Sequence, residues 1–294
     1  MFRGSSVIIR SVVISMVMVC QLFADTLSTS EMGVRFWGGL DGRDAYDVAL
    51  LRAVLDATIS THGGYDLVVE KEAFGDARGR REIELGNLVN VYNSPLRQDS
   101  ISRQERVIPV LIPTMKGLLG YRALAVREES FPRVAKIESL PDLAEFKLGQ
   151  GRGWVDIAIY RYNKIPVVEA AVYPLLFSML SRERIELLPL GIGEMDDALA
   201  VQVDEFPSLK KYPHLILYYP FPTVFQVSAK YPKLAERIEF GLSRLQDNGK
   251  ASVIFEAHFS ELLESYKRSN PKVIRLENPL IESDLGLTYP DLLD

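Results

Sequence analysis

The order of strand-like and helix-like segments near the N-terminus constrains the fold most strongly. Residues 33–39, GVRFWGG, have the composition of a short strand that ends in glycine. Residues 42–64 follow with apolar side chains at helical spacing, and a Gly-Gly pair ends that segment. Residues 65–72, YDLVVEKE, then alternate like a strand. A strand, a helix and a strand in this order predict a parallel sheet with crossover helices, and hence an α/β fold.

Two prolines interrupt a later apolar run and predict a change in the course of the chain. Residues 215–229, LILYYPFPTVFQVSA, are rich in strand-forming residues but contain Pro220 and Pro222. Proline cannot donate a ladder hydrogen bond, so the pattern argues against a central strand and for a crossing segment or a sheet edge. Residues 231–249 then predict an amphipathic helix, and residues 255–268 predict a second helix.

The first 24 residues have the composition of a secretory signal. Two arginines precede the uncharged, mostly apolar run 11–24, which is shorter than the roughly 20 apolar residues of a membrane span. We therefore expect export and cleavage between Ala24 and Asp25; an uncleaved N-terminal anchor is the alternative. The only cysteine, Cys20, lies in this run, so the mature chain would lack disulfides and thiolate metal sites.

The charge of the chain argues against two classes of partner. The formal net charge is −5, and removal of residues 1–24 takes away two arginines and no acid, which leaves −7. An acidic exported protein is a poor candidate for binding nucleic acids or anionic membrane surfaces.

A glycine-rich loop in the middle of the chain has the form of a binding loop. Residues 146–163, FKLGQGRGWVDIAIYRYN, carry an apolar segment into three alternating glycines just before a helix. Glycines and helix N–H groups together favour bound anions or polar groups. The spacing is G-x-G-x-G rather than the dinucleotide G-x-G-x-x-G, although Glu169 stands where a ribose-binding acid could lie. A nucleotide site, a tight turn, and a loop whose Trp154 or Arg152 contacts a small ligand all remain open.

Several longer segments resemble one family. Residues 148–159, LGQGRGWVDIAI, followed by residues 173–199 resemble the second lobe of type 2 periplasmic solute-binding proteins, the family-3 polar amino-acid binders. Residues 102–126 resemble the first-lobe segment of that family and the crossing strand that follows it. Residues 231–259 resemble its closing helices, so the resemblance extends over roughly residues 30–260.

This resemblance implies two α/β lobes joined by two crossing strands, with a cleft that closes on a small solute. The expected division is a signal peptide at 1–24, lobe I at 25–124 and 220–294, and lobe II at 125–219. It also implies a monomeric periplasmic protein, without cofactor or metal, that delivers an amino acid or small carboxylate to an ABC permease or a membrane sensor.

In the family, an arginine in the first lobe binds the carboxylate of the ligand, and Arg106 best matches that position. The alternative for Arg106 is a surface ion pair with Glu105. The family has a threonine three or four residues earlier, where this chain has Arg103 and Ser102. Ser102 could supply the missing hydroxyl.

Six further residues are candidates for contact with the solute. Trp37 follows the first strand, at the edge where open α/β sheets bind ligands, but it could equally pack at the rim. Trp154 could stack on a ligand or pack in the core, and Arg122 could reach the cleft or brace the hinge by pairing with an acid. Glu194 could meet an ammonium group or serve as a helix cap. Arg152 and Gly153 complete the set.

The sequence gives little support for catalysis. No two of the three histidines share a metal-ligand spacing, and no G-x-S-x-G elbow occurs. We therefore predict a binding protein rather than an enzyme. Two alternatives remain: a sensory or scaffold relative with a degenerate pocket, and an enzyme similar to cyclohexadienyl dehydratases, in which Glu194 would be the acid-base residue.

Overall fold

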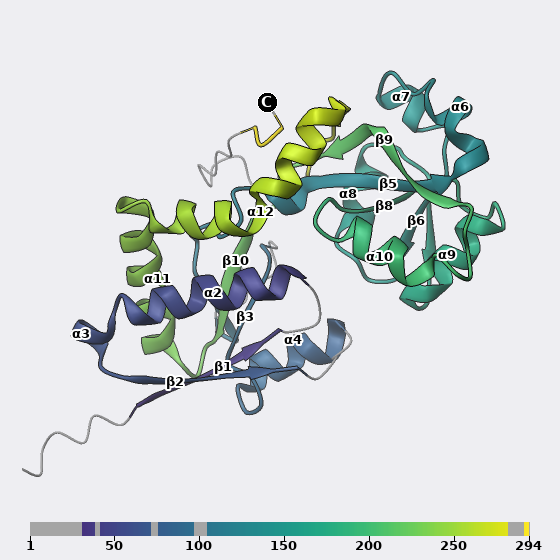
Figure 1. Cartoon of the computed structure of the whole chain (residues 1–294). Coiled ribbons are helices and arrows are strands. Elements are labelled where there is room, and N and C mark those ends of the chain that lie inside the picture. Colours follow the sequence, from purple (N-terminus) through teal and green to yellow (C-terminus); the bar gives the residue numbers. More distant parts are fainter. Residues whose placement is uncertain (1–30, 39–41, 72–75, 97–104, 282–290, 294) are drawn as a thin grey trace, which may run out of the picture.

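Two α/β lobes, each built around its own sheet, make up the computed structural model of the chain (Figure 1). The structure describes residues 31–38, 42–71, 76–96, 105–281 and 291–293. The predicted signal at 1–24 and Ser102 lie outside these ranges. In the part of the chain that is described, no helix combines the length and the apolar character that a membrane crossing requires.

The sheet of the first lobe has the spatial order β2-β1-β3-β10-β4. These strands are β1 (Met32–Trp37), β2 (Tyr65–Glu70), β3 (Val91–Pro95), β4 (Val107–Pro109) and β10 (Thr223–Ser228). β1 is parallel to both β2 and β3, whereas β10 is antiparallel to β3 and β4. The parallel pair β1 and β2 confirms the strand-helix-strand unit predicted at the N-terminus.

The helices of the first lobe bury apolar stripes of the kind expected from their sequences. They are α2 (Gly42–Asp56), α3 (Ile59–His62), α4 (Asp76–Leu85), α11 (Pro232–Asp247) and α12 (Lys250–Ser269). Leu50, Leu51 and Leu55 on α2 are at most 1% exposed, and each such burial stabilises the fold by about 1.5–3 kcal/mol. α11 approaches α2 so closely that a Cβ at Gly241 would lie 2.7 Å from Val54.

The second lobe contains a four-stranded sheet of order β11-β9-β5-β8 and the parallel pair β6 and β7. These strands are β5 (Tyr121–Arg127), β6 (Leu148–Gly151), β7 (Val167–Ala170), β8 (Leu188–Gly191), β9 (Leu209–Tyr218) and β11 (Lys272–Arg275). Its α-helices are α6 (Phe131–Val134), α7 (Leu140–Leu143), α8 (Asp156–Tyr162), α9 (Tyr173–Ser181) and α10 (Met195–Gln202). A bridge between Leu148 and Leu187 connects β6 to the residue before β8.

Two antiparallel segments carry the chain between the lobes, as predicted. The chain enters the second lobe through the 3₁₀ turn η1 (Leu118–Gly120) and β5, and it returns through β9 and residues 219–222. The backbones meet closely, because a Cβ at Gly120 would lie 2.2 Å from the carbonyl oxygen of Tyr219. Pro220 and Pro222 lie in this crossing. The crossing is confirmed, but the expectation of a sheet edge is wrong for the flanking residues: β9 and β10 each pair on both sides, because the two prolines fall between the strands and not within them.

α12 forms a further connection between the lobes (Figure 1). Near its N-terminal end, the ring centroids of Phe255 and Phe259 lie 6.0 and 5.0 Å from that of Tyr46 on α2. Near its C-terminal end, the hydroxyl of buried Tyr266 donates to the carbonyl of Ile192, just after β8, over 3.5 Å. β11 then pairs with β9. We propose the lobe boundaries predicted from the sequence, except that β11 belongs to the sheet of the second lobe, since it pairs with β9.

Candidate functional site

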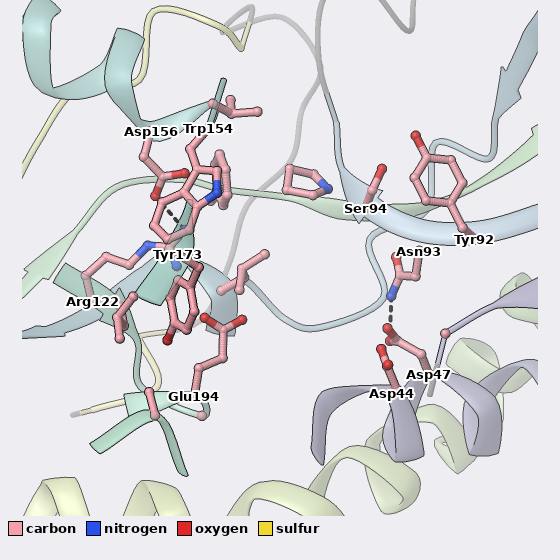
Figure 2. Close-up of a pocket in the computed structure, with 18 of the residues that line it drawn as sticks. Asp44, Asp47, Tyr92, Asn93, Ser94, Arg122, Trp154, Asp156, Tyr173 and Glu194 are labelled. Carbon is pink, nitrogen blue, oxygen red and sulfur yellow. Dashed lines mark hydrogen bonds and ion pairs between the residues drawn. The ribbon is translucent and has the colours of Figure 1, made fainter. Parts of the chain in front are cut away.

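A cavity with a volume of about 690 Å³ lies between the two lobes (Figure 2). The first lobe contributes residues from β1, α2, α4 and β3, and the second lobe contributes residues from β5, α8, β8 and α10. A cavity of this size is in the range of small-molecule sites, about 300–1,000 Å³. Both lobes contribute aromatic rings and ionisable side chains to its walls.

The wall of the first lobe forms where β1 ends beside the start of the parallel strand β3. Trp37, the last residue of β1, is the register partner of Tyr92, the second residue of β3, and their rings stack with centroids 5.7 Å apart. Asp44 and Asp47 lie in the first turns of α2, and Asn93 Nδ2 donates to Asp47 Oδ1 over 2.6 Å. Ligands commonly bind at this edge of open α/β sheets because the strand ends and helix starts meet there.

The glycine-rich loop forms part of the opposite wall, and each of its glycines has a local cause. A Cβ at Gly149 would lie 2.2 Å from Ile185, and one at Gly151 would lie 2.5 Å from the ring of Trp154. Gly153 has a φ of +84°, which side-chain-bearing residues rarely adopt. The loop therefore serves to turn the chain and to seat Trp154, whose ring lies in the cleft 6.1 Å from that of Tyr173 (Figure 2).

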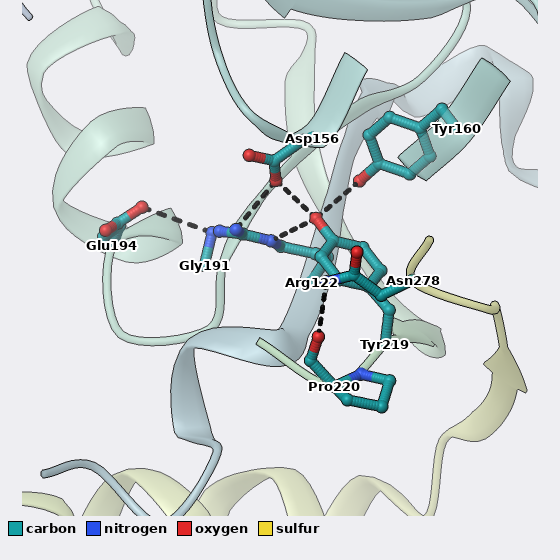
Figure 3. A network of polar contacts seen from close by, with 8 residues as sticks. All are labelled: Arg122, Asp156, Tyr160, Gly191, Glu194, Tyr219, Pro220 and Asn278. Carbon is teal, nitrogen blue, oxygen red and sulfur yellow. Dashed lines mark hydrogen bonds and ion pairs between the residues drawn. The ribbon is translucent and has the colours of Figure 1, made fainter. Parts of the chain in front are cut away.

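A buried polar network holds the start of α8 against the crossing strands (Figure 3). Arg122 on β5 places its Nη2 2.7 Å from Oδ1 of Asp156 and donates from Nε to the hydroxyl of Tyr219 over 2.8 Å. Tyr219 in turn donates to Asp156, and the hydroxyl of Tyr160 lies 3.3 Å from that of Tyr219. One cation, one carboxylate and two phenols thus join β5, the return crossing and α8.

The network keeps Arg122 charged and the phenol of Tyr219 protonated. Burial by itself lowers the pKa of the Arg122 guanidinium, but Asp156, with smaller contributions from Tyr219, Tyr160 and Glu194, raises that pKa above its ordinary value. Burial raises the pKa of Tyr219 well above 10. Arg122 therefore stays charged and paired. Of the two roles that the sequence left open for it, the geometry favours the brace within the hinge region.

Glu194 occupies the turn between β8 and α10. Its Oε2 accepts the backbone N–H of Gly191 over 3.3 Å, and the side chain is half-buried on the cleft side of that turn. Asp197 lies one helical turn further along α10 and also lines the cavity. Two carboxylates from the second lobe thus lie along the same cleft as Asp44 and Asp47.

The structure brings four of the eight predicted residues to the cavity: Trp37, Arg122, Trp154 and Glu194. Arg152 and Gly153 are exposed in the loop and do not line it. Ser102 is outside the described residues.

Arg106 also lies away from the cleft. Its side chain is 55% exposed and lies 3.6 Å from Glu84 and 3.8 Å from Glu105. The reason is topological. β4 is parallel to β3, because both are antiparallel to β10, and the two strands start at the same level of the sheet. Arg106 precedes the edge strand β4 and thus lies at the end of the sheet away from Ser94 and Pro95, the last residues of β3, which line the cleft.

Sequence reasoning missed other residues of the site. Tyr92 and Asn93 are the second and third residues of β3, so the strand-end rule that placed Trp37 does not find them; they reach the cleft because β3 starts beside the end of β1. Asp156 and Tyr219 carry no such signal, because their roles depend on Arg122, a distant residue of the chain. Among the described residues, no group of His, Cys, Asp and Glu side chains is arranged to hold a metal ion.

Comparisons of the sequence and of the structure give different results. No family model and no curated protein matches the sequence. An ancestral arginine-binding protein bound to arginine matches the structure at 16% identity and a TM-score of 0.52, over 77% of this chain and 98% of that one. The ligand-binding core of GluR0 in complex with L-glutamate matches at 14% identity and a TM-score of 0.51, over 78% and 98%.

A third solved structure is that of a transport protein. It is an amino acid ABC transporter substrate-binding protein from Streptococcus pneumoniae bound to L-arginine, at 13% identity and a TM-score of 0.51, over 78% of this chain and 94% of that one. At such identities the likeness concerns the fold. The chain has the type 2 periplasmic binding protein fold that the sequence resemblance implied. These neighbours hold ligands of opposite charge, so the fold leaves the identity of a ligand open.

Proposed function

We propose that this protein, which shares its fold with amino-acid-binding substrate-binding proteins, captures a small polar solute in its interlobe cleft. The observation that carries the proposal is the cavity of about 690 Å³, to which both lobes contribute aromatic and ionisable side chains. The amino acid or small carboxylate expected from the sequence defines the size class of this solute.

Capture would proceed by hinge closure. The lobes rotate about the crossing region, the two walls approach one another, and the solute is removed from water. A solute shifts this equilibrium only by its difference in affinity between the closed and open forms. Side chains on both walls supply that difference, because a solute can contact both walls at once only when the lobes are closed.

The closed form would present a surface to a membrane partner, either an ABC permease or the periplasmic part of a sensor. The Streptococcus pneumoniae neighbour is a substrate-binding protein of an ABC transporter, which supports the permease as the partner. The basic and apolar N-terminal segment supports export to the periplasm, where a monomer would be sufficient for this task.

Intrinsic fluorescence offers a direct test. The chain has two tryptophans, Trp37 and Trp154, and they line opposite walls of the cleft. A solute that enters the cleft should change the emission and raise the melting temperature of the protein by mass action. The variants Trp37→Phe and Trp154→Phe assign the signal to each wall. If no solute in a panel of amino acids, carboxylates and amines changes either quantity, the protein does not capture solutes of these classes.

A further inference from the structure

The described walls of the cleft carry more negative than positive charge. The charged side chains among the described lining residues are five carboxylates and two guanidiniums: Asp44, Asp47, Asp156, Glu194, Asp197, Arg80 and Arg122. Asp156 pairs with Arg122 at 2.7 Å. The described lining therefore has a net negative charge of three, five carboxylates less two guanidiniums. A solute that enters such a cleft is selected by its positive charge.

Neither of the two arginines considered from the sequence is placed to bind a carboxylate in this cleft. Arg106 precedes the edge strand β4, and its side chain is exposed beside Glu84 and Glu105. Arg122 lines the cleft, but its Nε and Nη2 are engaged by Tyr219 and Asp156, and its side chain is only 7% exposed. A two-point contact between a ligand carboxylate and both Nη atoms would have to displace Asp156 from a buried pair, which is strongly unfavourable.

Aromatic rings complete a lining suited to cations. Trp37 and Tyr92 form a stacked pair on one wall, and Trp154 and Tyr173 form a tilted pair on the other. The face of an aromatic ring attracts ammonium and guanidinium groups within about 6 Å, and tryptophan attracts them best. Closure would therefore bring a ring face from each lobe toward a cation held between the acids.

We propose that the captured solute is an organic cation, an amine or a guanidinium, whose positive group is bound by Glu194 and Asp197 of the second lobe and by Asp44 of the first. This inference rests on the proposed function and specifies its ligand class. Asp47 has a supporting part, because it is only 1% exposed.

The same charges couple binding to closure. Figure 2 shows Asp44 and Asp47 on one side of the cleft and Glu194 on the other. Closure without a ligand brings these like charges together and is opposed by their repulsion. A cation between them converts the repulsion into attraction. The empty protein is thus held open, and the cation itself supplies the free energy of closure.

A matched pair of probes tests the proposal on the full-length mature protein. Agmatine carries the guanidinium of arginine but has no carboxylate. Titration by calorimetry and tryptophan fluorescence would compare agmatine, arginine, putrescine, glutamate and succinate. We expect the cations to bind, agmatine at least as tightly as arginine, and glutamate and succinate to be rejected. Affinity for the cations should fall as salt is raised.

Single substitutions identify the acids responsible. Glu194→Gln keeps an oxygen that can accept the Gly191 N–H but removes the charge, and it should weaken binding of the cation by about tenfold or more. Asp197→Asn, at an exposed position on α10, should act in the same direction and tests the idea should the first variant fold poorly. The matched control is Asp204→Asn, an exposed acid beyond the end of α10 and outside the cleft, which should leave affinity unchanged.

The possible results separate this inference from the proposed function. Binding of glutamate or succinate but not of the amines overturns the cation proposal and leaves solute capture intact. Arginine binding that falls more than tenfold on going to agmatine also overturns it, since the carboxylate would then be recognised. Equal affinities of the Glu194→Gln, Asp197→Asn and Asp204→Asn variants would refute the assignment of the acids. A complete lack of binding by every probe contradicts both proposals.

Discussion

The two walls of the cleft differ in what holds their side chains in place. On the first lobe, Trp37 ends β1, and Tyr92 and Asn93 lie in the neighbouring strand β3, so the sheet itself positions them. On the second lobe, the start of α8 is held by a buried pair between Arg122 and Asp156, which are distant in the sequence. The first wall thus depends on backbone pairing and the second on a side-chain network. The comparison predicts that replacing a polar residue lowers the stability of the protein more in the second wall than in the first.

The largest effect should follow loss of the cation in the second wall. Arg122→Met leaves Asp156 buried without its partner, and breaking a buried ion pair in this way costs about 3–5 kcal/mol of the free energy of unfolding. Urea denaturation monitored by circular dichroism measures the loss. The double variant Arg122→Met with Asp156→Leu should recover part of it. A loss below about 1 kcal/mol in the single variant would mean that the network does not hold this wall.

A steric change in the same wall should have an intermediate effect. Gly151→Ala puts a methyl group into the ring of Trp154, and overpacking of this kind costs about 1–3 kcal/mol. We also expect the tryptophan emission to shift, because the ring must move. Gly153→Ala is the matched control: apart from its two chain neighbours, no residue has an atom within 4 Å of the added Cβ, but φ is +84°. It should lower stability without moving the ring, so equal emission shifts would contradict our account of the loop.

The corresponding polar contact in the first wall should contribute less than Arg122. Asn93→Ala removes the donor to Asp47, a carboxylate that is 1% exposed, and loss of a buried hydrogen bond costs about 1–3 kcal/mol. The cost should stay below that of Arg122→Met because the strand ends remain paired. Thermal unfolding of both variants under one set of conditions checks the order, and the reverse order would refute the contrast between the walls.

The smallest effect is expected at Arg106. Its two ion-pair partners lie 3.6 and 3.8 Å away on the exposed edge of the first lobe, and such surface pairs contribute less than about 1 kcal/mol. Arg106→Ala should leave both stability and solute affinity nearly unchanged. A large loss of affinity in calorimetry would place this side chain in the cleft of the solute-bound form, contrary to the geometry described here.

The parts of the fold that follow local rules could be predicted from the sequence. The period of residues 42–64 indicated α2, and Pro220 with Pro222 marked the crossing, because proline excludes one set of backbone hydrogen bonds. Trp37 was found because strand ends in parallel sheets gather at one edge. Each of these inferences needs only the residues of the segment itself.

Arg106 shows where such reasoning ends. Its place depends on the direction of β4, and that direction is set by pairing with β10, more than a hundred residues later. The partner of Arg122 was equally hidden, since Asp156 read only as the first residue of a helix after the glycine loop. Contacts between segments far apart in the chain decide both cases, and neither follows from composition or spacing.

α12 has a mechanical consequence for any motion of the lobes. A single helix of 20 residues touches α2 near one end and the turn after β8 near the other, beside the two crossing segments. Two bodies joined at several points along one side can rotate about that side, but sliding or twisting would disrupt the ring contact of Phe259 with Tyr46 and the hydrogen bond of Tyr266 to Ile192. The cleft should therefore open and close by hinge rotation about one axis. Shortening α12 or kinking it with a proline would allow other motions and lower the affinity for the solute.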